Sequence, residues 1–288
     1  ASAIMPTERS SLQGRIMPEL PEVETVVRML RPRLEGRTLT GVRVGPRRLR
    51  VPWQRHWNAQ LVGRRLDHIH RRGKWIMISL ARPDSGDALL VHLGMTGRLT
   101  VAEPKTPRAP HTHAVFHLDH GKHELRFQDP RRFGQIRYLP ASEHARLQGT
   151  ETLGPEPWQL TTNDLAAQVC RTRRCIKAVL LDQRVLAGIG NIYADEALFE
   201  ARLHPGRIAL TLARNEVDRL RRAVVRVLDR AIRKHGSTIL TFYYGDDERG
   251  EYQNEFRVYG RQGEPCRRCR ALIAATRLAG RGTHYCPT

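Results

Sequence analysis

The hydrophobic pattern of this chain changes at the segment 153–157, which reads LGPEP. From Thr38 to about Leu139, short β-rich runs are separated by turn residues, whereas after Pro157 apolar residues recur at the helical period of about 3.6. Short strands at this spacing predict an antiparallel sandwich or barrel. The sequence therefore predicts an α+β protein of two domains with a boundary near residue 150, which suits a chain of 288 residues.

The expected elements follow from these two periods. A helix led by Pro21 and running to about Leu34 is expected to pack on the first half. The predicted strands are Leu39–Val44, Trp75–Leu80, Ala88–Met95, His113–Leu118, His123–Phe127 and Gln135–Leu139. The helices predicted in the second half run from a cap at Thr162 or Asn163 to about Cys170, from about Cys175 to Gln183, and from about Leu212 to His235. A glycine turn at Ala187–Glu196 leads into one more helix, and its free backbone N–H groups suit a phosphate, although a plain helix connection has the same pattern.

The net charge limits the class of partner. The chain carries 49 basic and 29 acidic residues, a formal charge of +20, which favours a polyanion such as nucleic acid. No stretch approaches the roughly 18 apolar residues that a membrane span requires. Residues 1–16 lack the apolar core of a secretory signal, so we expect a soluble intracellular protein preceded by an extension, a cloning remnant or a misassigned start.

The segment that begins at Met17 combines a proline with three carboxylates. If Met17 is removed, Pro18 becomes a secondary amine, which with a pKa near about 8 is partly unprotonated at neutral pH and nucleophilic. Glu19 and Glu22 are then candidates for general acid–base catalysis, with Glu19 protonating a departing oxygen. The structural alternative is the first turn of an amphipathic helix, where acidic residues favour the dipole.

Three further motifs lie on predicted turns. Arg71–Trp75 is basic and opens a strand, which predicts either a phosphate clamp or a solvated strand end. The run His92–Gly97 presents an exposed Met95, and Asp129–Gly134 carries Phe133 between arginines and a glycine. Apolar wedges beside arginines unstack a base step in DNA. A core methionine and a buried phenylalanine are the alternatives.

Three of the five cysteines have the spacing of a zinc ribbon. Two residues separate Cys266 from Cys269, and sixteen separate Cys269 from Cys286. The spacing predicts a structural zinc ion whose fourth cysteine would stand at position 289, with His284 a strained substitute. Cys170 and Cys175 are expected to be free thiols.

The order of these motifs resembles the formamidopyrimidine-DNA glycosylase (MutM, Fpg/Nei) family from Met17 to the end. The segments that carry the resemblance are Pro18–Thr25 (PELPEVET), Arg72–Lys74 (RGK), His92–Gly97 (HLGMTG), Asp129–Gly134 (DPRRFG), residues 153–157, Gly188–Glu196 (GIGNIYADE) and the cysteine ribbon. The resemblance implies an N-terminal catalytic β-sandwich with flanking helices over 18–150. A helix-two-turn-helix DNA-binding domain over 151–245 and a zinc-ribbon hairpin over 246–288 would follow.

The resemblance also implies an activity. Members of the family excise oxidised purines, such as 8-oxoguanine and formamidopyrimidines, from duplex DNA and cut the abasic strand by β- and δ-elimination. Pro18 would attack C1′ and form a Schiff base, Glu19 would be the general acid, and Glu22 a supporting acid. The family also implies a bacterial, cytoplasmic base-excision repair enzyme that acts on chromosomal DNA. The sequence does not specify the oligomeric state, and a monomer is the default expectation.

Further site residues are implied by their positions in the family motifs. Lys74 matches a lysine that grips phosphate and donates a proton in β-elimination, and Arg281 matches the zinc-finger arginine of δ-elimination. We expect Arg281 to position phosphate instead, because a guanidinium with a pKa above about 12 releases a proton poorly. The remaining DNA-binding residues implied are the wedge Met95, Arg131 and Phe133, with Arg131 facing the orphaned cytosine, and the contacts His92, His111, Arg132, Arg171 and Asn191. The segment 241–252 would close over the base.

Two departures and three alternatives accompany this interpretation. If residues 1–16 stay attached, the nitrogen of Pro18 is an amide and cannot attack, and the missing fourth cysteine would weaken the finger. The alternatives are an endonuclease VIII-like glycosylase for oxidised pyrimidines, a non-catalytic DNA-binding form blocked at its N-terminus, and, more remotely, an RNA-binding zinc protein. Leu20 and the Arg131 and Phe133 wedge favour the purine enzyme.

Overall fold

The computed structural model describes residues 17–47, 49–81, 86–144, 153–238 and 249–288. The predicted extension 1–16 and the predicted boundary near residue 150 lie outside these ranges. Most of the predicted base-covering segment, residues 241–248, is also outside them.

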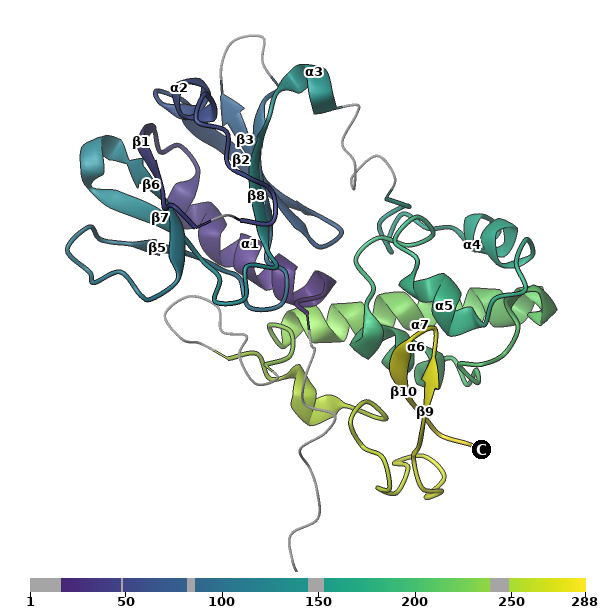
Figure 1. Ribbon diagram of the computed structural model, residues 1–288. Helices are drawn as coiled ribbons and strands as arrows, with labels where there is room; N and C mark the ends of the chain where they lie inside the picture. The colour runs from purple at the N-terminus through teal and green to yellow at the C-terminus, as the bar shows by residue number, and fades with distance from the viewer. Residues whose placement is uncertain (1–16, 48, 82–85, 145–152, 239–248) are drawn as a thin grey trace, which may run out of the picture.

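The first half consists of one long helix and two four-stranded antiparallel sheets. Helix α1 (Leu20–Leu34) begins at the predicted proline segment, with Glu19 at its N-cap. One sheet has the strand order β1-β6-β7-β5 and the other β2-β3-β4-β8. Their strands are β1 (Leu39–Val44), β2 (Arg65–Arg72), β3 (Trp75–Ala81), β4 (Ala88–His92), β5 (Arg98–Ala102), β6 (Thr112–Leu118), β7 (His123–Gln128) and β8 (Gln135–Leu139). Apolar residues of α1 and of both sheets share one core, so the predicted antiparallel sandwich is confirmed (Figure 1).

Two strands were absent from the sequence prediction. β2 reads RLDHIHRR, and its two buried apolar residues, Leu66 and Ile69, are three apart because the register shifts between them. That spacing hides the two-residue period of a strand. β5 was missed because it is only five residues long and follows the His92–Gly97 turn at once. β4 ends at His92 and not at Met95, so the predicted end of that strand was wrong by three residues.

The second half is a helical bundle with a β-hairpin. Its helices are α4 (Thr162–Val169), α5 (Ile176–Leu181), α6 (Asn191–Glu200) and α7 (Arg214–Arg233), and its hairpin strands are β9 (Ala274–Leu278) and β10 (Arg281–Tyr285). Thr161 caps α4 through a reciprocal box with Asp164, so the predicted cap at Thr162 or Asn163 was one or two residues late.

Both halves also contain short helical segments. The first half has α2 (Trp57–Leu61), α3 (Ala141–His144) and a 3-10 turn at Asp119–Gly121, and the second half has 3-10 turns at Ala209–Thr211 and Tyr252–Glu255.

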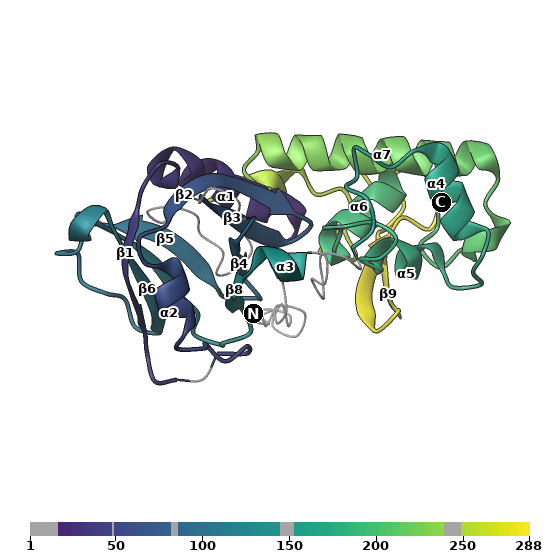
Figure 2. The ribbon, with the colours of Figure 1, turned by 90° about the horizontal axis from the view of Figure 1, so that it is seen from above.

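Helix α7 buries an apolar stripe against the bundle and carries its charges on the other face. It extends from the bundle to α1 in both views (Figures 1 and 2). Within the described ranges, no helix is long and apolar enough to cross a lipid bilayer.

The first residues of α1 join the two halves. Leu20 packs into the core of the second half, and its N–H donates to the carbonyl of Gly188 at 3.1 Å. Gly188 has φ +87°, and a Cβ there would lie 2.5 Å from the Leu20 side chain. The predicted glycine turn is therefore the surface on which the N-terminal segment of the chain rests.

Candidate active site

A cavity of about 610 Å³ lies between the two halves of the chain. Its walls come from the start of α1, the β2–β3 turn, the end of β4, the turn before α6, and the β9–β10 hairpin. Five of the predicted site residues line it, namely Glu19, Lys74, His92, Asn191 and Arg281. Pro18 is buried between two residues that line the cavity, Met17 and Glu19.

The carboxylate of Glu19 caps helix α6 from another part of the chain. Its Oε2 accepts the N–H of Gly190 at 2.7 Å, and its Oε1 accepts the N–H of Ile192 at 3.0 Å. Gly190 is the N-cap residue of α6 and has no side chain with which to satisfy these donors. A Cβ at position 190 would lie 2.3 Å from Cδ of Glu19, so glycine is what admits the carboxylate.

The surroundings of Glu19 set its protonation. Burial raises the pKa of Glu19 to about 7, against the lowering effect of Lys74 and of the N–H groups of Ile192 and Tyr193. A carboxylic acid with a pKa near neutrality can both donate and accept a proton at physiological pH. The residue thus has the properties of a general acid.

Glu22 is also buried, but it does not line the cavity. Its Oε1 accepts the hydroxyl of Tyr193 at 2.6 Å and the N–H of Ser237 at 2.7 Å, and its Oε2 accepts the N–H of Glu19 at 3.0 Å. These bonds link α1 to α6 and to the residues that follow α7. The arrangement favours a positioning role for Glu22 beneath Glu19.

Lys74 and His92 also line the cavity. Arg71 and Arg72 end β2, and Lys74 lies in the turn before β3, so the basic motif closes a hairpin as well as opening a strand. Burial lowers the pKa of Lys74, and burial with the charges of Lys74 and Arg50 lowers the pKa of His92 to about 4. Nδ1 of this neutral His92 accepts the N–H of Gly94 at 3.0 Å, which leaves the proton on Nε2 as a donor.

The predicted wedge residues come from two turns that pack against each other. A Cβ at Gly94 would lie 2.5 Å from the nitrogen of Gly134, so the two backbones meet closely. Asp129 links the turns, because it accepts the hydroxyl of Thr96 and the N–H of Gly134. The Arg131 guanidinium lies 4.7 Å from the centre of the exposed Phe133 ring.

Met95 lies on the first of these turns and is half-buried, so it is less exposed than the sequence predicted. Phe133 is exposed, which excludes the alternative of a buried turn. The structure therefore brings the turns of Met95 and Phe133 together. Arg131, Arg132 and Phe133 line a separate hollow of about 670 Å³ with Leu49 and Arg50.

The other predicted DNA contacts lie outside the cavity lining. His111, Arg132 and Arg171 are all exposed. His111 and Arg132 have positive φ values of 65° and 55°, a conformation that is uncommon for such side chains. Arg171 follows α4.

The hairpin that carries Arg281 is held by buried polar groups. The carbonyl of Gly282 accepts Nδ2 of Asn191 at 3.0 Å and Nζ of Lys177 at 2.9 Å. Lys177 and Asp195 are fully buried and form an ion pair of 2.7 Å. Asp195 in turn accepts the N–H of His284 at 2.9 Å, so His284 faces α6.

Tyr259 is a cavity residue that the sequence did not indicate. Its N–H donates to Glu196 at 2.9 Å, and it lines the cavity together with Asn191. Burial raises the pKa of Tyr259 to about 12, so its hydroxyl stays neutral and can donate. A single tyrosine in the segment 256–261, which reads FRVYGR, has no periodicity or spacing that distinguishes it.

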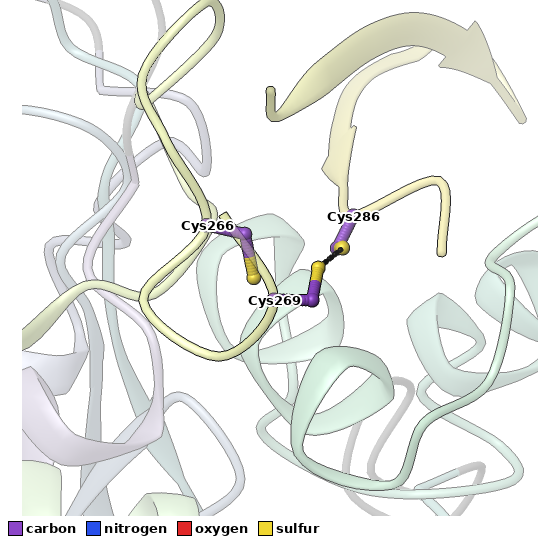
Figure 3. A group of neighbouring side chains, drawn as sticks. All are labelled: Cys266, Cys269 and Cys286. Atoms are coloured by element: carbon purple, nitrogen blue, oxygen red, sulfur yellow. Dashed lines mark hydrogen bonds between the residues drawn. The ribbon is translucent and has the colours of Figure 1, made fainter. Parts of the chain in front are cut away.

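The three ribbon cysteines converge near the C-terminal end of the chain (Figure 3). Their sulfur atoms lie within 4.8 Å of one another, and Sγ of Cys269 lies 3.3 Å from Sγ of Cys286. Thiolates at this separation fit the tetrahedral coordination of zinc. Cys170 and Cys175 are free thiols.

Three family descriptions match successive parts of the chain. "Formamidopyrimidine-DNA glycosylase N-terminal domain" matches residues 17–136, and "Formamidopyrimidine-DNA glycosylase H2TH domain" matches residues 153–243. "Zinc finger found in FPG and IleRS" matches residues 263–288. Together with the three cysteines, this last match identifies a site for one structural zinc ion.

Whole-chain comparisons give the same grouping. The Formamidopyrimidine-DNA glycosylase of Geobacillus kaustophilus is 44% identical over 275 residues, which cover 94% of this chain and 98% of that protein. A crystal structure of a Lactococcus lactis Fpg variant with DNA containing Fapy-dG has a TM-score of 0.85 and 33% identity, covering 94% of this chain and 98% of that one. MutM (Fpg) of Thermus thermophilus has a TM-score of 0.81 and 41% identity, covering 94% and 97%.

Proposed function

The chain belongs to the formamidopyrimidine-DNA glycosylase family, and we propose that it excises oxidised purines from duplex DNA and then cuts the abasic strand with the residues of this cavity. It is thus a DNA glycosylase of base-excision repair. Cleavage of the strand by β- and δ-elimination is the part of the proposal that goes beyond the family name. Relatives solved with DNA that contains Fapy-dG or an abasic site support both the lesion class and the product.

One observation carries the proposal. Glu19, an acid with a pKa of about 7, lies in the cavity beside Lys74 and directly follows the proline that would be the nucleophile. The two groups that a Schiff-base mechanism requires, an amine and an acid, are therefore adjacent in the chain. The positive charges of Lys74 and Arg281 in the same cavity suit the phosphates on either side of a flipped nucleotide.

The chemistry follows from these positions. The lone pair of the Pro18 nitrogen attacks C1′, the bond from C1′ to the base breaks, and the base leaves with the proton that the amine nitrogen gives up. Glu19 protonates the sugar ring oxygen, the ring opens, and an iminium ion joins Pro18 to C1′. Loss of a C2′ proton then expels the 3′ phosphate, and a second elimination expels the 5′ phosphate. Water finally hydrolyses the iminium and frees the amine.

Removal of Met17 is a condition of this mechanism. While Met17 is attached, the nitrogen of Pro18 belongs to a peptide bond and its lone pair is delocalised. Cleavage before Pro18 would release a secondary amine at the edge of the cavity that Met17 lines. The activity therefore depends on the N-terminal processing of the chain.

The other predicted residues bind DNA in this proposal. Met95, Arg131 and Phe133 fill the space left by the extruded base, with Arg131 at the orphaned cytosine, while His92, Asn191 and the exposed His111, Arg132 and Arg171 contact phosphates. Lys74 and Arg281 act on the phosphates that leave. Glu22 acts through its bond to the N–H of Glu19.

We also propose that the protein acts as a monomer on the chromosomal DNA of a bacterium, in its cytoplasm. The domains would span 18–150, 151–245 and 246–288, a division that the three matched ranges support.

The test is borohydride trapping on a duplex with 8-oxoguanine opposite cytosine, followed by intact mass and N-terminal sequencing. The expected result is one covalent adduct on protein that begins at Pro18. Protein that still begins at Ala1 should bind the duplex and give no adduct. An adduct on that longer form would contradict the proposal and move the nucleophile to a lysine, with Lys74 the first to examine. Preference for thymine glycol over 8-oxoguanine would contradict the lesion class.

A further inference from the structure

Two arginines that no motif indicated stand on either side of one carboxylate in the cavity wall. Arg174, just before α5, and Arg184, in the turn after it, both pair with Asp182. All three residues line the same cavity as Glu19 and Lys74. We propose that Arg174, Asp182 and Arg184 form a clamp for a backbone phosphate of the DNA strand next to the lesion. This inference rests on the proposed function.

The contacts of Asp182 hold both guanidinium groups in place. Its Oδ1 accepts Nε of Arg184 at 3.0 Å and the N–H of Arg184 at 3.1 Å, while its Oδ2 accepts Nη2 of Arg184 and Nη1 of Arg174, each at 3.0 Å. Nε of Arg174 also donates to the hydroxyl of Thr172 at 3.3 Å. The carboxylate therefore fixes the direction of both side chains before any ligand arrives, which lowers the entropy lost on binding.

The clamp keeps donors and charge for a ligand. A guanidinium has five N–H groups, and Asp182 occupies only two of those on Arg184 and one of those on Arg174. Two cations around one anion leave a net charge of about +1. The side chains of Arg174 and Arg184 are 46% and 73% exposed, so their remaining N–H groups can reach a phosphate.

The place of the clamp indicates which phosphate it binds. The cavity that contains it also contains Lys74, Asn191 and Arg281, which the proposed function assigns to the phosphates at the lesion. A strand whose flipped nucleotide enters this cavity must continue past its rim. Arg174 and Arg184 line the same cavity with exposed side chains, so we assign them to a backbone phosphate beyond those at the reacting sugar.

Two arginines on α7 serve as a matched control. Arg222 pairs with Asp218 and Arg226 with Glu200, and their side chains are 58% and 49% exposed. They belong to the same half of the chain and have similar ion pairs, but neither lines the cavity. If the pairs at Asp182 were ordinary surface ion pairs, replacing either set would have the same effect on DNA affinity.

The experiment measures Kd as a function of salt for full-length protein and a duplex with a tetrahydrofuran abasic analogue. The variants are Arg174→Gln with Arg184→Gln, the charge-retaining Arg174→Lys with Arg184→Lys, and the control Arg222→Gln with Arg226→Gln. Each phosphate contact contributes about 0.9 to the slope of log Kd against log salt. We expect the first variant to lose about 0.9 from that slope, as for one phosphate, so its ratio of Kd at 200 mM to Kd at 50 mM salt falls about 3.5-fold. The lysine variant should keep the slope.

Equal slopes for the first variant and the α7 control would overturn the clamp, provided that wild-type protein excises 8-oxoguanine. A slope lost equally by the lysine variant would also overturn it, since charge would then not be the cause. If wild-type protein starting at Pro18 neither excises the base nor binds the duplex, the proposed function fails and the clamp fails with it. Thermal unfolding of each variant confirms that the comparison is made between folded proteins.

Discussion

Glu19 and Gly190, 171 residues apart, meet in a hydrogen bond of 2.7 Å between a side-chain carboxylate and a backbone N–H. This bond lies at the junction of the two halves, where α1 rests on the turn before α6. The position of the proposed general acid is therefore determined by the docking of the two halves, and a change at either partner should affect the chemistry.

Replacing Gly190 with alanine should move Glu19. The added Cβ would lie 2.3 Å from Cδ of Glu19, closer than any real contact, so the carboxylate must leave its place. We expect single-turnover excision of 8-oxoguanine to fall at least about 100-fold and the free energy of unfolding to fall by about 1–3 kcal/mol, the usual cost of overpacking. Gly45→Ala is the control, because a Cβ there has only one neighbour, at 3.7 Å. Unchanged excision by the Gly190 variant would show that Glu19 does not act from its observed position.

Replacing Glu19 with glutamine should change how stability depends on pH. The folded pKa is about 7 and the reference value is 4.5, so between these values the unfolded chain has lost a proton that the folded chain retains. The free energy of unfolding of the wild type therefore falls as pH rises through this window, by about 3 kcal/mol in total from this group. The variant has no such group, so its disadvantage relative to wild type should shrink between pH 4.5 and 7. Urea unfolding of both proteins at several pH values measures the difference.

The titration of Glu19 should also appear in the pH dependence of the excision rate. If protonated Glu19 is the acid, the single-turnover rate should fall above about pH 7, while the affinity for an abasic analogue stays level there. A rate that rises steadily from pH 6 to pH 8 would contradict this role and favour a step controlled by the amine of Pro18.

Much of the fold could be predicted from the sequence, because it depends on local patterns. The switch in period after residue 157 separated the sheets from the bundle, and Pro21 marked the first helix. Strand β2 could not be found in this way, since its register shift puts Leu66 and Ile69 three residues apart. The end of β4 at His92 depends on the turn geometry between Leu93 and Gly97, whose backbones bond at 2.8 Å.

The sequence predicted those residues of the site that belong to the family motifs, and it did not predict the others. Glu19, Lys74 and Arg281 meet in one cavity through tertiary docking, which no periodicity encodes. Tyr259 was missed because its place depends on the N–H groups of residues 257–259, all bound by the buried carboxylate of Glu196. Arg174 and Arg184 look like two of many arginines until the structure places Asp182 between them.

Replacing Lys177 with methionine should destabilise the second half strongly. The change leaves Asp195 fully buried without its cation, and such a loss costs about 3–5 kcal/mol. Combining Lys177→Met with Asp195→Leu should recover most of that free energy of unfolding, because an apolar pair removes the buried charge. Excision by the double variant should remain impaired, since Lys177 and Asp195 also hold Gly282, Thr283 and His284 beside Arg281. Full activity in the stable double variant would mean that the pair serves stability alone.

Replacing Arg281 with lysine separates two roles for that residue. The residue is exposed on the hairpin and lines the cavity, where its planar guanidinium can donate two parallel hydrogen bonds to one phosphate. We expect the lysine variant to bind an abasic duplex at least about tenfold more weakly and to give less δ-elimination product. An ammonium group cannot reproduce the two parallel hydrogen bonds of a guanidinium. A proton donor, by contrast, would work as well or better as lysine, whose pKa of about 10.4 makes it the stronger acid. A δ-elimination rate at saturating DNA equal to or above that of wild type would therefore assign proton transfer to Arg281 and reject phosphate positioning.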